Sequence, residues 1–217
     1  MAADTAHKML ADTNLQCLVL GTHNKKKRYE LAVLLEPYKI ALKTLDDFEN
    51  SIEVDETGQT FAENSALKAS LQARHLDQWV LGEDSGIVVD ELNGEPGVYS
   101  ARFSGPDATD AANNERLLSR LEGVPAIRRS AHYVCHMSLA DPSGVIRIAC
   151  EGKCHGMIRT TPAGNAGFGY DPLFEIPEYH RTFGQLGDGV KSVLSHRARA
   201  MRQLLINLRS LRSRNLG

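Results

Sequence analysis

The run Leu81-Gly-Glu-Asp-Ser-Gly86 carries two adjacent carboxylates, Glu83 and Asp84. We expect a strand to end here in a turn, because Asp, Ser and Gly favour turns. On a strand, neighbouring side chains point to opposite faces, so only a turn would let both carboxylates reach one ligand. Carboxylate oxygens suit magnesium, and one carboxylate could activate a water molecule. An acidic surface turn is the alternative.

A basic segment, Thr22-His-Asn-Lys-Lys-Lys27, follows the first apolar run of the chain. We expect it to join a strand to a helix, and helix N-termini with lysines beside them bind phosphate. The Walker A pattern is absent. The cations oppose the helix dipole, and an anionic ligand would relieve that conflict. The alternative is a solvated basic face with Thr22 or Asn24 as helix cap.

A further acidic segment, Asp55-Glu-Thr-Gly58, precedes a helix that is expected to begin at Thr60. Glu63 has a structural role there, because it completes a capping box with Thr60. Glu56 has no such role. It is therefore the better candidate for a metal ligand.

Aromatic and basic residues late in the chain could recognise a base. The loop Gly167-Phe-Gly-Tyr-Asp-Pro172 has glycines that let backbone approach a ligand and rings that can stack on it. Asp171 could accept a hydrogen bond from a base N–H. The segment Ser195-His-Arg197 and Lys191 upstream could contact a base or a phosphate. The alternatives are a tight turn with inward-packed rings, and a Ser195 helix cap with solvated neighbours.

Hydrophobic periodicity gives the elements that must position these residues. Alternating βα units with a long hairpin across Asp141–Gly144 predict an α/β fold, a mixed β-sheet flanked by helices. Strands are expected at 16–20, 39–45, 79–82, 87–92, 131–140 and 145–154, and helices at 24–36, 60–77, 108–121 and 192–212.

The whole chain has 217 residues, a net charge of −2 and 42% hydrophobic residues, as ordinary globular proteins do. This charge gives no bulk attraction to nucleic acid or membrane. No apolar run approaches the length of a membrane span. Residues 1–14 are mixed polar and are expected to form a disordered leader before a single domain over 15–217, whose length suits one large domain or two small lobes that share a core.

The four cysteines have no framework spacing, which favours a reducing, cytoplasmic location. Cys150, Cys154 and His155 could be read as a zinc cluster. We favour the alternative, in which Cys150 and Cys154 pack as small apolar residues of a strand.

These segments, in this order, resemble the inosine triphosphate pyrophosphatase family, which removes deaminated purine nucleoside triphosphates. The resemblance runs from Cys17 to about Leu208 and also includes Phe61-Ala-Glu-Asn64 and the stretch 94–105. It implies an elongated mixed sheet in two lobes with the site in a central cleft, magnesium as cofactor and a homodimer. The implied reaction converts dITP, ITP, XTP or dXTP to the nucleoside monophosphate and pyrophosphate.

The resemblance also assigns roles to single residues. Asp84 matches the proton acceptor and a metal ligand, and Glu56 matches the other metal ligand. Lys68 matches a further phosphate contact and Ser85 a substrate contact. The phosphate-binding turn comprises Thr22, His23, Asn24, Lys25, Lys26 and Lys27, and the purine-recognition group comprises Phe168, Gly169, Tyr170, Asp171, Lys191, His196 and Arg197.

The reaction that the resemblance implies has a physical rationale and two rivals. Asp84 would activate water for attack at the α-phosphorus, and Arg197 with backbone amides would donate to a 6-oxo purine, where adenine has an amino group. Guanine shares the 6-oxo group, so its rejection needs a further element. The first rival function is that of a Maf-type pyrophosphatase with another base preference. It would not explain the Phe-Gly-Tyr-Asp and Ser-His-Arg segments. The second rival function is that of a non-catalytic nucleotide sensor, which would not need the intact carboxylates.

Overall fold

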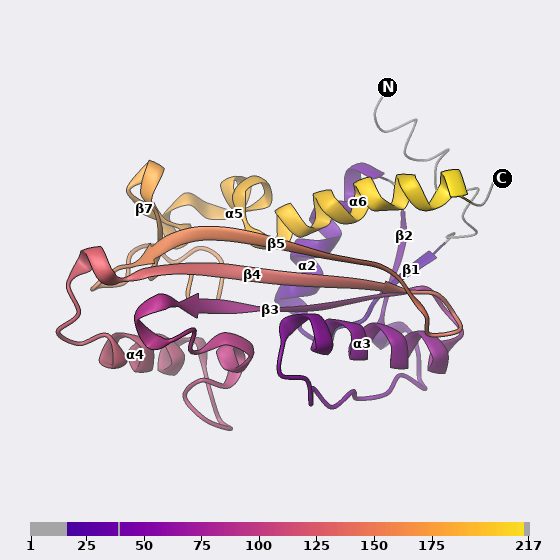
Figure 1. The fold of residues 1–217 in the computed structure, drawn as a ribbon, viewed down its shortest axis with the longest axis horizontal. Coiled ribbons are helices and arrows are strands. Elements are labelled where there is room, and N and C mark those ends of the chain that lie inside the picture. Colours follow the sequence, from indigo (N-terminus) through magenta and orange to yellow (C-terminus); the bar gives the residue numbers. More distant parts are fainter. Residues whose placement is uncertain (1–16, 39, 215–217) are drawn as a thin grey trace. The chain divides into compact units, whose positions relative to one another are not determined.

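A computed structural model describes residues 17–38 and 40–214 as one seven-stranded mixed sheet with helices (Figure 1). The strand order is β2-β1-β3-β4-β5-β6-β7, with β1 parallel to β2 and β3, and β6 antiparallel to β5 and β7. The predicted α/β fold with a mixed sheet is confirmed. The strands are β1 Cys17–Leu20, β2 Ala41–Thr44, β3 Val80–Val89, β4 Ser130–Ala140, β5 Ile146–Ile158, β6 Phe174–Ile176 and β7 Arg181–Thr182; the helices are α2 Lys25–Leu35, α3 Phe61–Leu76, α4 Asp110–Arg120, α5 Phe183–Leu194 and α6 His196–Arg214.

The chain divides into two compact units, each with its own apolar core. Unit 1 holds the described residues up to Asp84, together with 136–151 and 200 onward, and unit 2 holds 85–135 and 152–199. In unit 1, Ala69 and Ala73 of α3 pack with residues of β1, β3 and β4. In unit 2, Leu117 and Leu121 pack with residues of β3 to β6 and with α5. The predicted leader, 1–14, lies outside the described residues.

The predicted starts of two helices are confirmed, and each has the helix-capping residue that the sequence indicates. Asn24 caps α2, and Thr60 caps α3 with the full capping box. The Thr60 Oγ1 accepts from the Glu63 amide at 3.1 Å, and the Glu63 carboxylate accepts from the Thr60 amide at 3.1 Å. Such caps satisfy N–H groups that the helix leaves without partners.

The prediction of a turn at residues 83–86 is wrong. Residues 80–89 form one continuous strand, β3, and Glu83 and Asp84 are buried within it. β3 has β1 on one side and β4 on the other, and Figure 1 shows it beside the long strand β4. β3 pairs with β1 at Val80 and Leu81 and is hydrogen-bonded to β4 on its other side, and sheet pairing of this kind satisfies backbone groups without a turn.

The single final helix predicted over 192–212 is also wrong at its start. Ser195 has an extended backbone, so α5 ends at Leu194 and α6 begins at His196. The sequence signal for α5 is weak because three glycines lie within it, and Gly187 departs from helical geometry.

The strands β6 and β7 were not predicted from the sequence, because they have three and two residues, too few to show a hydrophobic period. In the described part of the chain, none of the helices has the length and apolar character to cross a membrane.

Gly82 allows α3 to lie directly against β3. A β-carbon at Gly82 would stand 2.6 Å from the Ala69 amide nitrogen and closer still to the Ser65 carbonyl oxygen. We expect Gly82→Ala to lower the free energy of unfolding by about 2–3 kcal/mol, because α3 must shift to admit a methyl group. Denaturant unfolding would measure this. The matched control is Gly189→Ala, which meets open space at the surface of α5 and should change stability by less than about 1 kcal/mol. Equal effects of the two substitutions would contradict the packing.

Candidate active site

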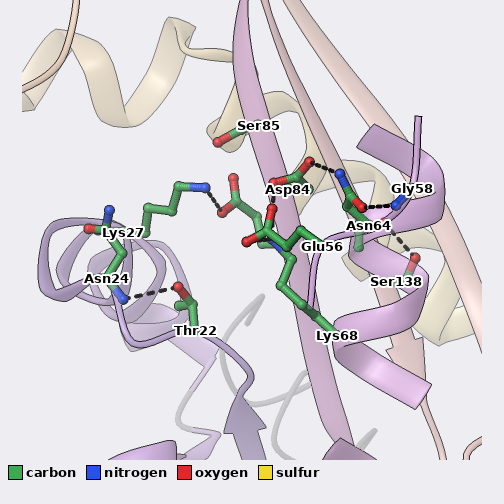
Figure 2. A network of polar contacts seen from close by, with 12 residues as sticks. Thr22, Asn24, Lys27, Glu56, Gly58, Asn64, Lys68, Asp84, Ser85 and Ser138 are labelled. Atoms are coloured by element: carbon green, nitrogen blue, oxygen red, sulfur yellow. Dashed lines mark hydrogen bonds and ion pairs between the residues drawn. The ribbon is translucent and has the colours of Figure 1, made fainter. Parts of the chain in front are cut away.

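Unit 1 brings together three carboxylates and two lysines from distant parts of the sequence (Figure 2). Lys68 Nζ lies 2.9 Å from Asp84 Oδ1 and 3.3 Å from Glu56 Oε1. Lys27 Nζ lies 3.0 Å from Glu83 Oε2. Glu56, Asp84, Lys68 and Lys27, which were predicted to bind metal or phosphate, thus form one ionic cluster with Glu83. The side chain of Glu83 is 0% and that of Asp84 7% exposed, whereas that of Glu56 is 34% exposed.

Two helices, rather than a turn, bring partners to the adjacent carboxylates. Glu83 and Asp84 are consecutive on β3, so their side chains leave the strand in opposite directions. Glu83 meets Lys27 in the first turn of α2, and Asp84 meets Lys68 in α3. The loop before α3 adds Glu56 to the partners of Lys68.

The cluster shifts the proton affinity of two of its members. Burial raises the pKa of the Asp84 carboxyl above its ordinary value, although Lys68 and Lys27 act in the opposite direction. Burial acts to lower the pKa of Lys68, but the carboxylates around it, that of Asp84 foremost, raise it overall. Lys68 therefore stays charged, while Asp84 is a stronger base than an exposed aspartate.

The basic turn after β1 divides into caps and surface residues. Asn24 Oδ1 accepts from the amides of Lys26 at 3.0 Å and Lys27 at 3.1 Å, and Thr22 Oγ1 accepts from the Asn24 amide at 3.2 Å. The cap predicted as the alternative reading is therefore present. Lys25 and Lys26 are exposed. His23 is half exposed and lies 3.6 Å from Asp46. Of the six residues, Lys27 is the one that reaches the carboxylates.

The cluster has the ligand type that a hard divalent cation prefers, although its described residues have no preformed coordination geometry. Its three carboxylates outnumber its two lysines, and carboxylate oxygens are the ligands that magnesium prefers. Glu56 and Asp84 share Lys68 as their cationic partner. Among residues 17–38 and 40–214, no three His, Cys, Asp or Glu side chains form a group ready to hold a metal ion.

The environment of Cys150 and Cys154 does not favour the alternative of a zinc site. Cys150 and Cys154 are free and buried in β5, and burial raises the pKa of each thiol to about 11. A protonated thiol is a poor metal ligand, since zinc binds the thiolate. Their predicted packing as small apolar residues is confirmed.

In unit 2, the predicted purine-recognition residues form a second buried ionic network. Lys191 Nζ lies 2.5 Å from Asp171 Oδ2, which also accepts from the Phe168 amide at 2.8 Å. Lys191 Nζ lies 4.3 Å from the centre of the Phe168 ring, and the Arg197 guanidinium carbon lies 5.8 Å from it. Arg197 also donates to Ser85 Oγ at 3.0 Å. A half-buried ring is thus held against two cations.

The start of α6 is buried rather than solvated. His196 and Arg197 are 4% and 1% exposed, and the His196 ring stacks on Tyr133 with 4.6 Å between ring centres. Ser195 Oγ accepts from the Ala198 amide at 3.1 Å, so its predicted cap is present. The alternative of a cap with solvated neighbours is therefore wrong for His196 and Arg197.

The two aromatic residues of the Gly167–Pro172 loop have different environments. Tyr170 is buried in the core of unit 2, and its hydroxyl donates to the Ser100 carbonyl at 2.9 Å. The inward-packed alternative is thus correct for Tyr170, while Phe168 stays partly exposed. The Gly169 carbonyl accepts from Asn114 at 2.9 Å.

Sequence reasoning gave no role to Asn64 and Tyr133, which contact the two networks. Tyr133 donates to Asp171 Oδ1 at 3.4 Å, and no local pattern announces this contact between β4 and a later loop. Asn64 donates to Asp84 Oδ2 at 3.4 Å. The sequence could have indicated the role of Asn64, because Asn64 precedes Lys68 by four residues and the two side chains must lie on the same face of the helix.

Comparison with known proteins places the chain in a family. A sequence model of the Ham1 family matches residues 18–207. A dITP/XTP pyrophosphatase of Rhodopirellula baltica is 55% identical over 191 residues, 88% of this chain and 92% of the relative. One from Desulforamulus reducens is 46% identical over 188 residues, 87% of this chain and 93% of the relative.

Solved structures agree with the sequence comparison. A HAM1 protein of Coxiella burnetii has a TM-score of 0.81 and 35% identity, covering 89% of this chain and 98% of its own. A nucleoside-triphosphatase, or dITP/XTP pyrophosphatase, of Mycobacterium abscessus has a TM-score of 0.71 and 39% identity, covering 87% and 97%. The chain belongs to the Ham1 family, which confirms the resemblance seen in its sequence.

Proposed function

We propose that this protein hydrolyses deaminated purine nucleoside triphosphates (dITP, ITP, XTP and dXTP) to the nucleoside monophosphate and pyrophosphate, and so clears them from the nucleotide pool. Membership of the Ham1 family and the names of its relatives support this class of hydrolase. The observation that carries the proposal is the buried carboxylate of Asp84 beside Lys68 and near Lys27. That combination suits water activation next to phosphate.

Asp84 acts as the base in the proposed reaction. It accepts a proton from a water molecule while the water oxygen forms a bond to the α-phosphorus. The bond between the α-phosphorus and its bridging oxygen breaks, and pyrophosphate leaves. Lys27 and Lys68 stabilise the negative charge of the phosphoryl oxygens. The raised pKa of Asp84 improves proton transfer at neutral pH.

Glu56 and Asp84 would hold the magnesium ion, in keeping with their oxygen donors and their proximity to the same lysine. The bound ion would supply positive charge to the phosphoryl oxygens. Glu83 instead has Lys27 as its cationic partner, and its carboxylate holds that lysine within the cluster.

The proposed base selectivity rests on the Phe168 loop and Arg197. A purine can stack on the half-buried Phe168 ring, and Arg197 with backbone amides of the loop can donate to a 6-oxo group. Asp171 positions that loop through the Phe168 amide and Lys191, and its direct contact with a base stays a prediction. A mispaired amino group would cost about 1–3 kcal/mol, or roughly 10- to 100-fold in rate.

The substrate proposal is tested by pyrophosphate release with magnesium from dITP, XTP, dGTP, dATP and dTTP at equal concentrations. We expect dITP and XTP to be hydrolysed, with dATP slower by about 10- to 100-fold. Preferred hydrolysis of dTTP would favour the Maf-type alternative. Nucleotide binding without turnover of any of the five would favour the sensor. Chelation of divalent ions should abolish hydrolysis, and undiminished turnover without them would contradict the metal assignment.

We extend the proposal to a cytoplasmic homodimer. The family resemblance motivates the dimer, and the four free cysteines suit a reducing compartment. Sedimentation of the purified protein would test the dimer, because a monomer at micromolar concentration would contradict it. Fractionation of the native cells would test the location.

A further inference from the structure

We propose that Asn64 is a positioning residue, whose carboxamide joins the loop carrying Glu56 to Asp84 and fixes the orientation of the Asp84 carboxylate. Asn64 lies in the first turns of α3 and is 1% exposed. Figure 2 shows its side chain between Gly58 and Asp84. This inference rests on the proposed function of Asp84 as the base.

The hydrogen bonds of Asn64 determine which way its amide faces. Its Oδ1 accepts from the Gly58 amide at 2.8 Å, and its Nδ2 lies 3.4 Å from Asp84 Oδ2. A backbone N–H can only donate, and an ionised carboxylate can only accept. The oxygen of the carboxamide must therefore face Gly58, and its NH₂ group must face Asp84.

Asn64 and Lys68 together hold both oxygens of Asp84. Lys68 Nζ contacts Oδ1 at 2.9 Å, and Asn64 Nδ2 contacts Oδ2. The two donors are four residues apart in α3 and thus share one helix face. Rotation of an aspartate carboxylate about its last torsion is otherwise broad. Two donors from one rigid helix restrict that rotation, so Asp84 presents its basic oxygens in one direction.

The other end of the carboxamide positions the Glu56 loop. Residues 51–58 have no regular secondary structure, so their backbone groups need partners elsewhere. The Gly58 amide obtains its partner from Asn64. A β-carbon at Gly58 would stand 2.6 Å from Asn64 Oδ1 and 2.7 Å from the Glu63 β-carbon, so glycine is what permits this approach. Loss of Asn64 should therefore disturb both Asp84 and the segment that carries Glu56.

Two substitutions separate these effects. Asn64→Asp has the same shape and keeps an acceptor for Gly58, but it replaces the donor to Asp84 by a carboxylate. Asn64→Ala removes both bonds. The matched control is Gln72→Ala, since Gln72 is also a buried amide of α3 and bonds the backbone of Ile52 in the same loop. Gln72 bonds this loop at Ile52, away from the Gly58–Asn64–Asp84 contacts, so its loss tests removal of a buried α3 amide without removal of a donor to Asp84.

We expect both Asn64 variants to lower kcat for dITP by about 10- to 100-fold with KM changed less than about threefold, because positioning acts mainly on the chemical step. Gln72→Ala should keep kcat within about twofold of the wild type. Amide hydrogen exchange of a peptide covering 53–58, measured without nucleotide or metal, should accelerate in Asn64→Ala but not in Asn64→Asp.

Two results would overturn the inference. One is a kcat of either Asn64 variant equal to that of Gln72→Ala, and the other is unchanged exchange of residues 53–58 in Asn64→Ala. Failure of the proposed function would look different, because the wild-type protein itself would then release no pyrophosphate from dITP. The exchange experiment would still decide whether Asn64 holds the Glu56 loop.

Discussion

Replacing Asp84 by asparagine is expected to lower kcat for dITP by about a thousandfold. An amide has the shape of the carboxylate but cannot accept a proton from water at neutral pH, and general-base catalysis contributes about 10²- to 10⁴-fold. Asp84 is 5% exposed, so bulk water has little access to take over the proton in the variant. Steady-state pyrophosphate release by the purified variant measures the effect.

A second carboxylate of unit 1 supplies the control for this prediction. Asp141 lies in the turn between β4 and β5, where it accepts from Ser143 and pairs with Arg147. Asp141→Asn makes the same chemical change at a buried side chain outside the cluster, so it should cost some stability and leave kcat within about twofold. Circular dichroism would show that both variants are folded. Turnover by Asp84→Asn near the wild-type value would mean that another group is the base.

Much of the fold was predictable because its strongest signals are local. The capping box joins Thr60 to Glu63 within one helical turn, and β5 alternates between buried and exposed residues along most of its 13 residues. Interactions of this range are readable from a short window of sequence. The family resemblance then supplied the order of the segments.

The errors in the fold come from contacts across the sequence. Polar residues 83–86 suggest a turn, yet they continue β3, which is hydrogen-bonded to β4 in the sheet. The helix α5 was missed because its glycines have low helix propensity. Gly184 illustrates why a glycine stands there, since a β-carbon would lie 2.8 Å from the Ala163 carbonyl oxygen. That close approach is a tertiary contact.

The members of the site were easier to predict than its geometry. Carboxylates and lysines could be named by type, but the pairing of Lys27 with Glu83 joins residues far apart in sequence. Phe168 and Tyr170 are two residues apart in an aperiodic loop, so no pattern shows that Tyr170 packs inward while Phe168 stays partly exposed. Asn64 is the exception, because helical spacing relates it to Lys68.

Lys191→Met is expected to lower the free energy of unfolding by about 3–5 kcal/mol, because it leaves the charge of Asp171 buried without its cation. Lys191 and Asp171 are 4% and 1% exposed, and their charged atoms are 2.5 Å apart. Denaturant unfolding measures the loss. Arg159→Met is the control in the same unit, since Arg159 forms a partly exposed pair with Glu175 at 2.8 Å and should cost about 1 kcal/mol or less. Similar losses for the two substitutions would contradict the assignment of Asp171–Lys191 as a buried pair.

The double variant Lys191→Met with Asp171→Asn separates charge from packing. Asparagine at 171 keeps an oxygen for the Phe168 amide but carries no charge, so much of the stability lost in Lys191→Met should return. The loop would then be held while one of the two cations beside the Phe168 ring, that of Lys191, is absent. If the double variant regains stability but discriminates dITP from dATP less well than the wild type, Lys191 contributes to base selection through the ring. Unchanged discrimination would limit the role of Lys191 to neutralising Asp171.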